Sequence, residues 1–414
     1  MNSADKYKKN VLWNAIAGLI NASEAVIVLA VVSRVNGLRE AGILTLAFSL
    51  ANLFMTIGKF GIRNYQIAHE GEDFSFKTFL TFRIITVSVM FIITFVYVAY
   101  YFMSDRYTLE KSLAIFFVCM WYAVEAFEDV YVAKYQVLGR LDVGSKIFSV
   151  RWIATIFSFI VLDIILRNIV IAAAIAFMVD LILGIVLITY TYVKYKKPEY
   201  LELERGIKVL FIESIALCVS SFLYIYMTNV SKYIISSQLG DEVQAIYGYI
   251  SMPVFVISLL NSFVYQPQLT AYVAELRENK IPQFVKRIMR QLIILFLIIA
   301  ACLIGAYILG IPVLSVLYHA DLREYKIHLL VLLLGAGFFA LGAFMANMLI
   351  IADEQRKGMI GYLLVSISEY VLINALVDKF GLFGAVWGYT ISMFFMAVLF
   401  SGILIVVIRG RSTK

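Results

Sequence analysis

The stretch LREAGILTLAFSLANLFMTIGKFGIRNYQ, residues 38–66, decides the class of this protein. It has no charged residue between Glu40 and Lys59, so it is long enough to cross the hydrocarbon core of a bilayer as one helix. The apolar run then ends with a lysine, two glycines and an arginine. Lys59 and Arg63 are about one helical turn apart and therefore lie on one side of that end.

The rest of the chain repeats this apolar pattern. Of its 414 residues, 62% are hydrophobic and only 15% are charged, whereas charged residues make up roughly a quarter of a soluble protein. The sequence therefore predicts an all-α polytopic membrane protein. The apolar runs predict twelve transmembrane helices, at residues 10–33, 40–61, 79–102, 111–133, 147–166, 169–192, 209–235, 243–265, 290–310, 328–351, 358–377 and 383–408.

The basic residues predict an orientation for these helices. If the N-terminus is cytoplasmic, the connections on that side hold most of the 35 Lys and Arg residues. Both termini are then cytoplasmic, and the net charge of +7 reflects topology rather than nucleic-acid binding. In this orientation Lys59 and Arg63 reach the cytoplasmic surface. They serve there either as anchors of the helix or as a cationic entrance for an anionic head group.

A polar linker near the midpoint predicts two domains. The stretch VKYKKPEYLELERGIKV, residues 193–209, mixes charges with leucines, as amphipathic segments on a membrane surface do. We expect an N-terminal six-helix lobe at 1–193, a cytoplasmic linker at 194–208 and a C-terminal six-helix lobe at 209–414. Gly37 and Gly240 stand in equivalent turns of the two halves. Two such halves are pseudo-symmetric about an axis along the membrane normal, with a central cavity between them.

Ionisable residues inside predicted spans are the first candidates for a functional site, because such groups are costly in lipid and usually face the bundle interior. Asn14, Asn21 and Glu24 share one helical face, which either makes interhelical hydrogen bonds or lines the cavity. Glu125, Glu128 and Asp129 follow i, i+3, i+4 spacing on another span, and their expected partner is a cation, Arg151.

The remaining intramembrane polar residues lack an evident local partner. Asp180 is in the middle of its span, which favours the interior. In the second half, Glu213 lies near a span's inner end and Glu369 lies in the middle of another. Lys232 either extends to the outer interface or faces the cavity.

The three cysteines and three histidines form no disulfide, metal-ligand or catalytic spacing. The predicted outer loops are also short, whereas membrane-embedded polymerases and acyltransferases need catalytic side chains and often a large outer loop. We therefore expect no metal, no cofactor and no enzymatic activity.

Three segments resemble the Wzx-type polysaccharide flippases of the multidrug/oligosaccharidyl-lipid/polysaccharide exporter superfamily. They are SRVNGLREAGILTLAFSLANLFMTIGKFGIRNYQ (33–66), LGRLDVGSK (138–146) and FGLFGAVWGY (380–389). The resemblance implies a bacterial plasma-membrane flippase that moves undecaprenyl-diphosphate-linked oligosaccharide units by alternating access, for O-antigen, capsule or exopolysaccharide synthesis. We expect a monomer, because the pseudo-twofold can be satisfied within one chain. A polysaccharide polymerase and glycosyltransferases are the candidate partners.

The same resemblance implies roles for the intramembrane residues. Cations would receive the diphosphate, at Lys59, Arg63, Arg151 and Lys232. Acids and amides would bind sugar hydroxyls, balance the cations or take a coupling proton, at Asn21, Glu24, Glu125, Asp180, Glu213 and Glu369. Intramembrane acids outnumber intramembrane bases, however. That excess also suits the related multidrug and toxin extrusion proteins, so a cation/proton or cation/sodium antiporter is the alternative function.

Overall fold

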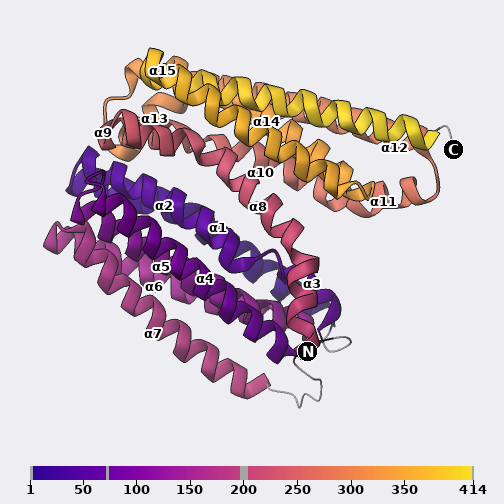
Figure 1. The fold of residues 1–414 in the computed structure, drawn as a ribbon, viewed down its shortest axis with the longest axis horizontal. Coiled ribbons are helices and arrows are strands. Elements are labelled where there is room, and N and C mark those ends of the chain that lie inside the picture. Colours follow the sequence, from indigo (N-terminus) through magenta and orange to yellow (C-terminus); the bar gives the residue numbers. More distant parts are fainter. Residues whose placement is uncertain (1–2, 71–73, 196–203, 413–414) are drawn as a thin grey trace. The chain divides into compact units, whose positions relative to one another are not determined.

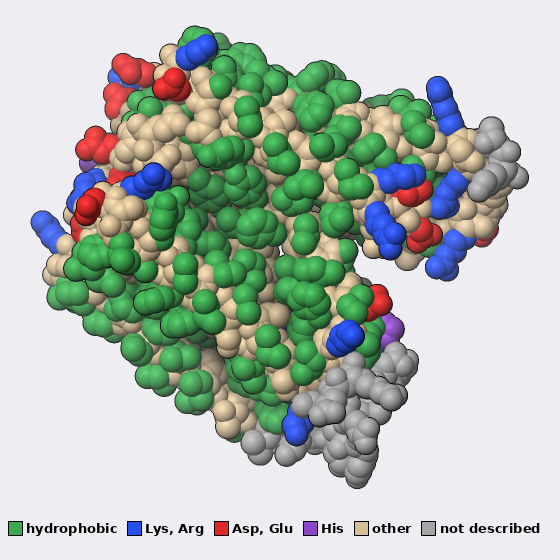
Figure 2. All heavy atoms as spheres, in the orientation of Figure 1, with side chains coloured by type: hydrophobic (Ala, Val, Ile, Leu, Met, Phe, Trp, Pro, Cys, Tyr) green, Lys and Arg blue, Asp and Glu red, His purple; other side chains and the backbone are tan. Residues whose placement is uncertain are grey.

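The computed structural model describes residues 3–70, 74–195 and 204–412, and its regular elements are helices (Figure 1). The face shown in Figure 2 is mostly hydrophobic, as expected for a surface that contacts lipid. The chain divides into two compact units, Met1–Ile225 and Tyr226–Lys414. The boundary lies within the helix α8 (Glu204–Gln238). We describe each unit by itself.

Unit 1 holds the start of α8 and seven further helices. These are α1 (Ser3–Val35), α2 (Leu38–Lys59), α3 (Arg63–His69), α4 (Phe76–Met103), α5 (Leu109–Val137), α6 (Leu141–Leu166) and α7 (Ile169–Tyr195). The helix α2 packs against α5 and α4, while α6 packs against α1 and α7. Every residue of α2 from 41 to 50 is buried. A helix that is apolar on all sides belongs at the centre of a bundle, so α2 forms the core of unit 1.

The end of α2 is locked in place by its neighbours. A Cβ atom on Gly58 would lie 2.8 Å from the Met90 sulfur and 3.0 Å from Ala126 Cβ, so only glycine allows α4 and α5 to approach so closely. Phe60 and Gly61 then adopt left-handed backbone conformations, with φ of 51° and 66°. This turn ends α2 at Lys59 and starts α3 at Arg63.

Unit 2 holds the end of α8 and the remaining helices. These are α9 (Asp241–Ser251), α10 (Val254–Tyr265), the 3₁₀ turn η1 (Gln266–Gln268), α11 (Leu269–Arg277), α12 (Ile281–Gly305), the π-helical turn η2 (Ala306–Gly310), α13 (Ile311–Tyr318), the 3₁₀ turn η3 (Arg323–Tyr325), α14 (Lys326–Ile351) and α15 (Gln355–Ser412). The central helix is α14, which contacts α10, α12 and α15. Its glycines permit this, because a Cβ on Gly335 would strike Tyr389 of α15 and one on Gly337 would strike Ile299 of α12.

The number of membrane crossings differs from the sequence prediction. Ten helical segments of the described residues are long and apolar enough to cross a membrane, so twelve are not confirmed. The helix α5 is not among them because its acidic residues make it too polar, and α15 counts once although its backbone breaks at Gly381. The predicted span 243–265 is divided into α9 and α10, and Pro253 stands at the start of α10.

Part of the predicted amphipathic linker, residues 196–203, lies outside the described residues. The neighbouring residues end α7 and begin α8.

The turns at Gly37 and Gly240 are alike in the structure. Each glycine precedes a helix with nearly the same backbone angles, φ of 103° and 87° with ψ close to 180°. This shared turn supports the equivalence drawn from the sequence.

Candidate functional site

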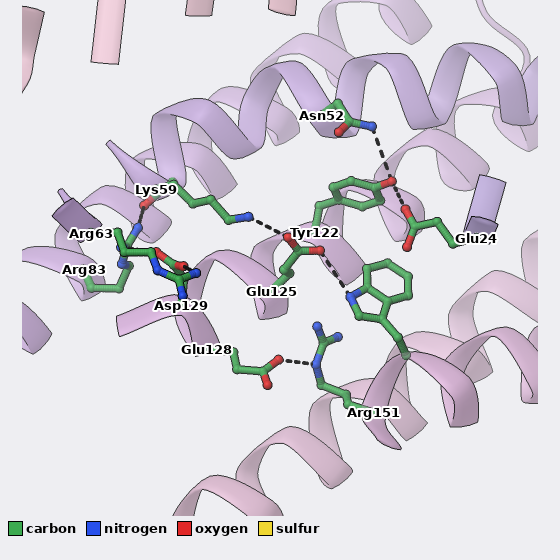
Figure 3. A network of polar contacts seen from close by, with 12 residues as sticks. Glu24, Asn52, Lys59, Arg63, Arg83, Tyr122, Glu125, Glu128, Asp129 and Arg151 are labelled. Atoms are coloured by element: carbon green, nitrogen blue, oxygen red, sulfur yellow. Dashed lines mark hydrogen bonds and ion pairs between the residues drawn. The ribbon is translucent and has the colours of Figure 1, made fainter. Parts of the chain in front are cut away.

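A network of charged and polar side chains lies inside unit 1 (Figure 3). Its centre is α5, where Glu125, Glu128 and Asp129 are all buried. Their spacing gives the three carboxylates slightly different directions around the helix, and each meets a different cation. We call this set of acids and their partners the α5 network.

Asp129 joins two arginines that come from different helices. One of its oxygens accepts from Arg63 Nη1 at 3.0 Å and the other from Arg83 Nη2 at 2.9 Å. Arg83 also donates to the carbonyl oxygen of Gly58 at 2.7 Å, and Arg63 donates to Gln136 at 3.1 Å. The carboxylate therefore ties the end of α2, the start of α3 and the first third of α4 to α5.

Glu125 holds the lysine at the end of α2. Its Oε1 lies 2.6 Å from Lys59 Nζ, and its Oε2 accepts from the Trp152 indole at 3.2 Å. Both carboxylate oxygens are thus satisfied, one by a cation and one by a neutral donor.

Arg151 is enclosed between two acids. Its guanidinium donates to Glu128 at 2.6 Å and to Asp180 at 2.5 Å, and its side chain has no exposed area. Asp180 also accepts from Thr155 at 2.6 Å. The predicted partnership of Arg151 with the α5 acids is confirmed, and Asp180 is its second partner. A buried cation between two carboxylates is stable only while the set stays complete.

Glu24 approaches the network from α1. The Tyr122 hydroxyl donates to one of its oxygens and accepts from Asn52 at 3.3 Å. The other oxygen of Glu24 is buried and has no hydrogen-bond partner among the described residues. Of the two roles open to it from the sequence, the structure shows interhelical hydrogen bonding.

One side of the network opens into a pocket of about 230 Å³ in unit 1. We call it the α1–α5 pocket. Lys59 and Arg63 are 31% and 37% exposed, whereas Arg83 and Arg151 are fully buried, so only the first two of these cations are presented to it. Its lining residues come from α1, α2, α3, α5 and α6: Asn14, Ala17, Gly18, Asn21, Lys59, Arg63, Glu125, Glu128, Asp129, Val132, Ser145 and Phe148.

The other predicted site residues lie away from this network. Glu213 is exposed on α8 in unit 1. Lys232 belongs to unit 2, where its ammonium group donates to Asn229 at 3.1 Å on the same helix. Glu369 of α15 is fully buried, and neither of its carboxylate oxygens has a hydrogen-bond partner among the described residues.

Sequence reasoning missed several members of the α5 network. Arg83 is the largest omission, and its signal was present, because it is a single charge within the apolar run of α4. Asn52 and Tyr122 gave a weaker signal, since an amide and a phenol in a membrane helix are common. Their part in the site follows only from the packing of α2 against α5.

Comparison with known proteins gives a family and a fold. Residues 7–268 match the family model described as "Polysaccharide biosynthesis protein". No curated protein matches the sequence.

Several solved structures are similar. An inward-facing multidrug resistance MATE family transporter of the MOP superfamily has a TM-score of 0.70 at 14% identity, covering 98% of this chain and 99% of that one. The lipid II flippase MurJ, in an inward closed conformation, has a TM-score of 0.65 at 14% identity over 94% and 86%. The Vibrio cholerae MATE transporter VcmN, in its bent form, has 0.63 at 11% over 99% and 98%. At these identities the likeness establishes the fold, an all-α multi-pass membrane fold.

Proposed function

The chain belongs to the polysaccharide biosynthesis protein family, and we propose that it flips a lipid-linked oligosaccharide across the membrane. The family match confirms the resemblance found in the sequence, and together with the transporter fold it favours transport over enzymatic catalysis. The proposed substrate is an undecaprenyl-diphosphate-linked repeat unit. The observation that supports this is the α1–α5 pocket, where two partly exposed cations are held in place by buried acids.

The diphosphate is proposed to bind Lys59 and Arg63. Both cations reach the α1–α5 pocket, and both are already oriented by carboxylates on α5. An arginine and a lysine positioned in this way suit a diphosphate, because the guanidinium forms paired hydrogen bonds to phosphate oxygens and the ammonium adds a compact charge. Arg151, which is enclosed by its two acids, is assigned a positioning role instead.

The acids remain satisfied when the diphosphate takes these cations. Asp129 keeps Arg83, which is fully buried and has no access to the substrate. Glu125 keeps the hydrogen bond from Trp152. Release of Lys59 and Arg63 therefore leaves Asp129 paired with a cation and Glu125 with one neutral hydrogen-bond donor, so each carboxylate keeps a partner. The exchange can be reversed when the substrate leaves.

The rest of the α1–α5 pocket suits a sugar next to the diphosphate. Asn14, Asn21 and Ser145 offer hydrogen-bond donors and acceptors for hydroxyls, and Phe148 offers an aromatic face. At about 230 Å³ the pocket is smaller than the 300–1,000 Å³ of typical ligand sites, so it holds only part of the substrate. Glu24, Asp180, Glu213 and Glu369 are proposed to serve coupling or charge balance.

We propose twelve crossings, since α5 is buried within unit 1 and α15 has a break that divides it into two helices. Both termini are placed in the cytoplasm of a bacterium, and lobes 1–193 and 209–414 alternate access to the substrate. Lys232 is retained as a second diphosphate contact. The chain acts as a monomer beside a polymerase and glycosyltransferases.

A cation antiporter is the second candidate. It is favoured by the excess of acids in the network. Among the described residues, five acids lie there with four cations: Glu24, Glu125, Glu128, Asp129 and Asp180 with Lys59, Arg63, Arg83 and Arg151. A site of this kind accepts an organic cation if an acid gives up its partner. Two structural relatives are MATE transporters, which agrees with this candidate at the level of the fold.

The test is transport of a fluorescent undecaprenyl-diphosphate oligosaccharide by protein reconstituted in liposomes. Lys59→Gln and Arg63→Gln are each expected to lower the rate by roughly tenfold or more, since hydrogen bonds to charged groups contribute about 1.5–3 kcal/mol. Arg39→Gln is the matched control, because Arg39 is 45% exposed and also pairs with a carboxylate, Glu110, at 3.1 Å.

The outcomes separate the candidates. Transport that falls in both pocket variants and persists in Arg39→Gln supports the flippase and its diphosphate site. Transport by the wild type that no variant alters removes Lys59 and Arg63 from the route. If the wild type moves no lipid but drives proton-dependent efflux of an organic cation, and Glu24→Gln abolishes that efflux, the antiporter is the function.

A further inference from the structure

A second charged pocket lies in unit 2, where α11 meets the start of α12. Its volume is about 290 Å³, and it is lined by Glu275, Gln283, Lys286, Arg287 and Arg290. We call it the α12 pocket. Figure 2 shows basic and acidic side chains gathered at the end of unit 2 that holds α11, beside a largely hydrophobic surface. Three basic residues and one acid make the pocket cationic.

The central arginine of the α12 pocket is fixed by its neighbours. Arg287 makes bonds of 2.6–3.1 Å to both oxygens of Glu275 and donates to Gln268 at 3.3 Å. Its guanidinium carbon lies 5.8 Å from the centre of the Tyr272 ring. The acid is therefore occupied by one cation and does not neutralise the other two.

Lys286 and Arg290 are the cations left to bind something else. Both are exposed, and among the described residues neither has an ion pair or a side-chain hydrogen bond. With Gln283 they follow i, i+3, i+7 spacing, so three donors form one stripe along the first turns of α12. Such a stripe suits an anion with several oxygen atoms.

The same stripe becomes apolar further along the helix. Ile293 and Leu297, three and seven residues after Arg290, are 62% and 61% exposed. A helical path of 38 residues from Ile281 to Tyr318 would measure about 57 Å, well beyond a hydrocarbon core of about 30 Å. This length leaves room for the polar first turns to extend into a head-group region, with the exposed Ile293 and Leu297 nearer the acyl chains.

We propose that the α12 pocket binds the phosphate head group of an anionic phospholipid. Lys286, Arg290 and Gln283 hold the phosphate, and Ile293 and Leu297 contact an acyl chain of the same molecule. Basic pockets beside membrane helices recognise anionic head groups in this way. The site is separate from the α1–α5 pocket and does not depend on what the protein transports.

The test is native mass spectrometry of the full chain in detergent, titrated with phosphatidylglycerol or with phosphatidylcholine. Lys286→Gln/Arg290→Gln is expected to weaken phosphatidylglycerol binding by roughly 25-fold, about fivefold for each basic residue removed. Arg356→Gln/Lys357→Gln is the matched control, since it removes two basic residues at the start of α15. This control is expected to bind phosphatidylglycerol as the wild type does. Phosphatidylcholine, which has no net charge, is expected to bind more weakly and equally to the wild type and both double variants.

The proposal is overturned by any of three results. Equal losses in both double variants would mean general surface charge rather than a site. Unaltered binding in Lys286→Gln/Arg290→Gln would remove the pocket from lipid binding. Competition by soluble glycerophosphoglycerol at the same concentration as phosphatidylglycerol would identify a free-anion site. Because transport is not the readout, failure here is distinct from failure of the flippase assignment.

Discussion

The two units differ in how their buried charged side chains are paired. In unit 1 the buried acids of the α5 network meet cations at 2.5–3.0 Å, and Arg151 alone serves two of them. In unit 2 Glu369 is equally buried but has no hydrogen-bond partner among the described residues, and Lys232 has an amide partner, Asn229. Buried polar contacts in unit 2 are mainly between neutral groups, such as Gln291 with Asn261 at 2.8 Å.

This difference separates two uses of a buried charge. In a set of paired acids and cations, a substrate charge can replace one member only if the remaining charges keep their partners. A solitary buried carboxyl such as Glu369 has no partner to exchange. In an apolar interior it needs a proton or a bound cation to balance its charge. Unit 1 is therefore the better place for recognition of an anionic head group, and Glu369 is the better place for a coupling ion.

The largest effect on stability is expected when Arg151, the central cation of the α5 network, is removed. Arg151→Met leaves Glu128 and Asp180 facing each other without compensation, so we expect a loss of about 3–5 kcal/mol in stability. The measurement is the thermal unfolding midpoint of purified protein in detergent. Arg151→Met/Asp180→Asn should recover part of that loss, because one of the two unpaired charges is gone. An unchanged midpoint in Arg151→Met would show that the pairing contributes nothing.

A smaller effect is expected where two cations share one acid. Arg83→Gln removes the buried partner of Asp129 and a donor to the Gly58 carbonyl, and should cost about 1–3 kcal/mol. Arg63→Gln removes the partly exposed partner and should cost about 0–1 kcal/mol. The measurement compares the unfolding midpoint and the transport rate of each variant with those of the wild type. Arg63→Gln should be stable but should transport roughly tenfold more slowly than the wild type or worse. The reverse order of stabilities would contradict the assignment of Arg83 as the structural cation.

The smallest change is expected in unit 2. Glu369→Gln removes a carboxyl that has no pair to break, and the amide is nearly the same size. Stability should therefore stay within about 1 kcal/mol of the wild type, as judged by the same unfolding midpoint. A fall of more than about 2 kcal/mol would reveal a partner for Glu369 and remove the contrast between the units.

The sequence was sufficient for the class of fold and for part of the network. Apolar run lengths predicted membrane helices, and i, i+3, i+4 spacing placed the α5 acids together, with Arg151 as their partner. It could not assign the partner of Asp180 or the role of Arg83. Those contacts depend on how α4, α5 and α7 are rotated about their axes, which a single helix does not specify.

The same limit explains the residues that stayed outside the network. Glu213, Lys232 and Glu369 satisfy the same test in the sequence as Glu125, since all are charged residues in apolar runs. Only packing distinguishes an exposed acid on α8 from a buried one on α5. The count of crossings differs for another reason. The sequence prediction included 111–133, whereas α5 carries too many charged residues to be counted by length and composition.

The central claim is that Lys59 and Arg63 recognise the diphosphate, and head-group discrimination tests it most directly. Binding of undecaprenyl diphosphate would be compared with binding of undecaprenyl monophosphate to the wild type, Arg63→Gln and Arg39→Gln. We predict that the wild type prefers the diphosphate, that Arg63→Gln reduces the preference by about tenfold and that Arg39→Gln retains it. A preference that survives in Arg63→Gln would place the diphosphate elsewhere and contradict the account.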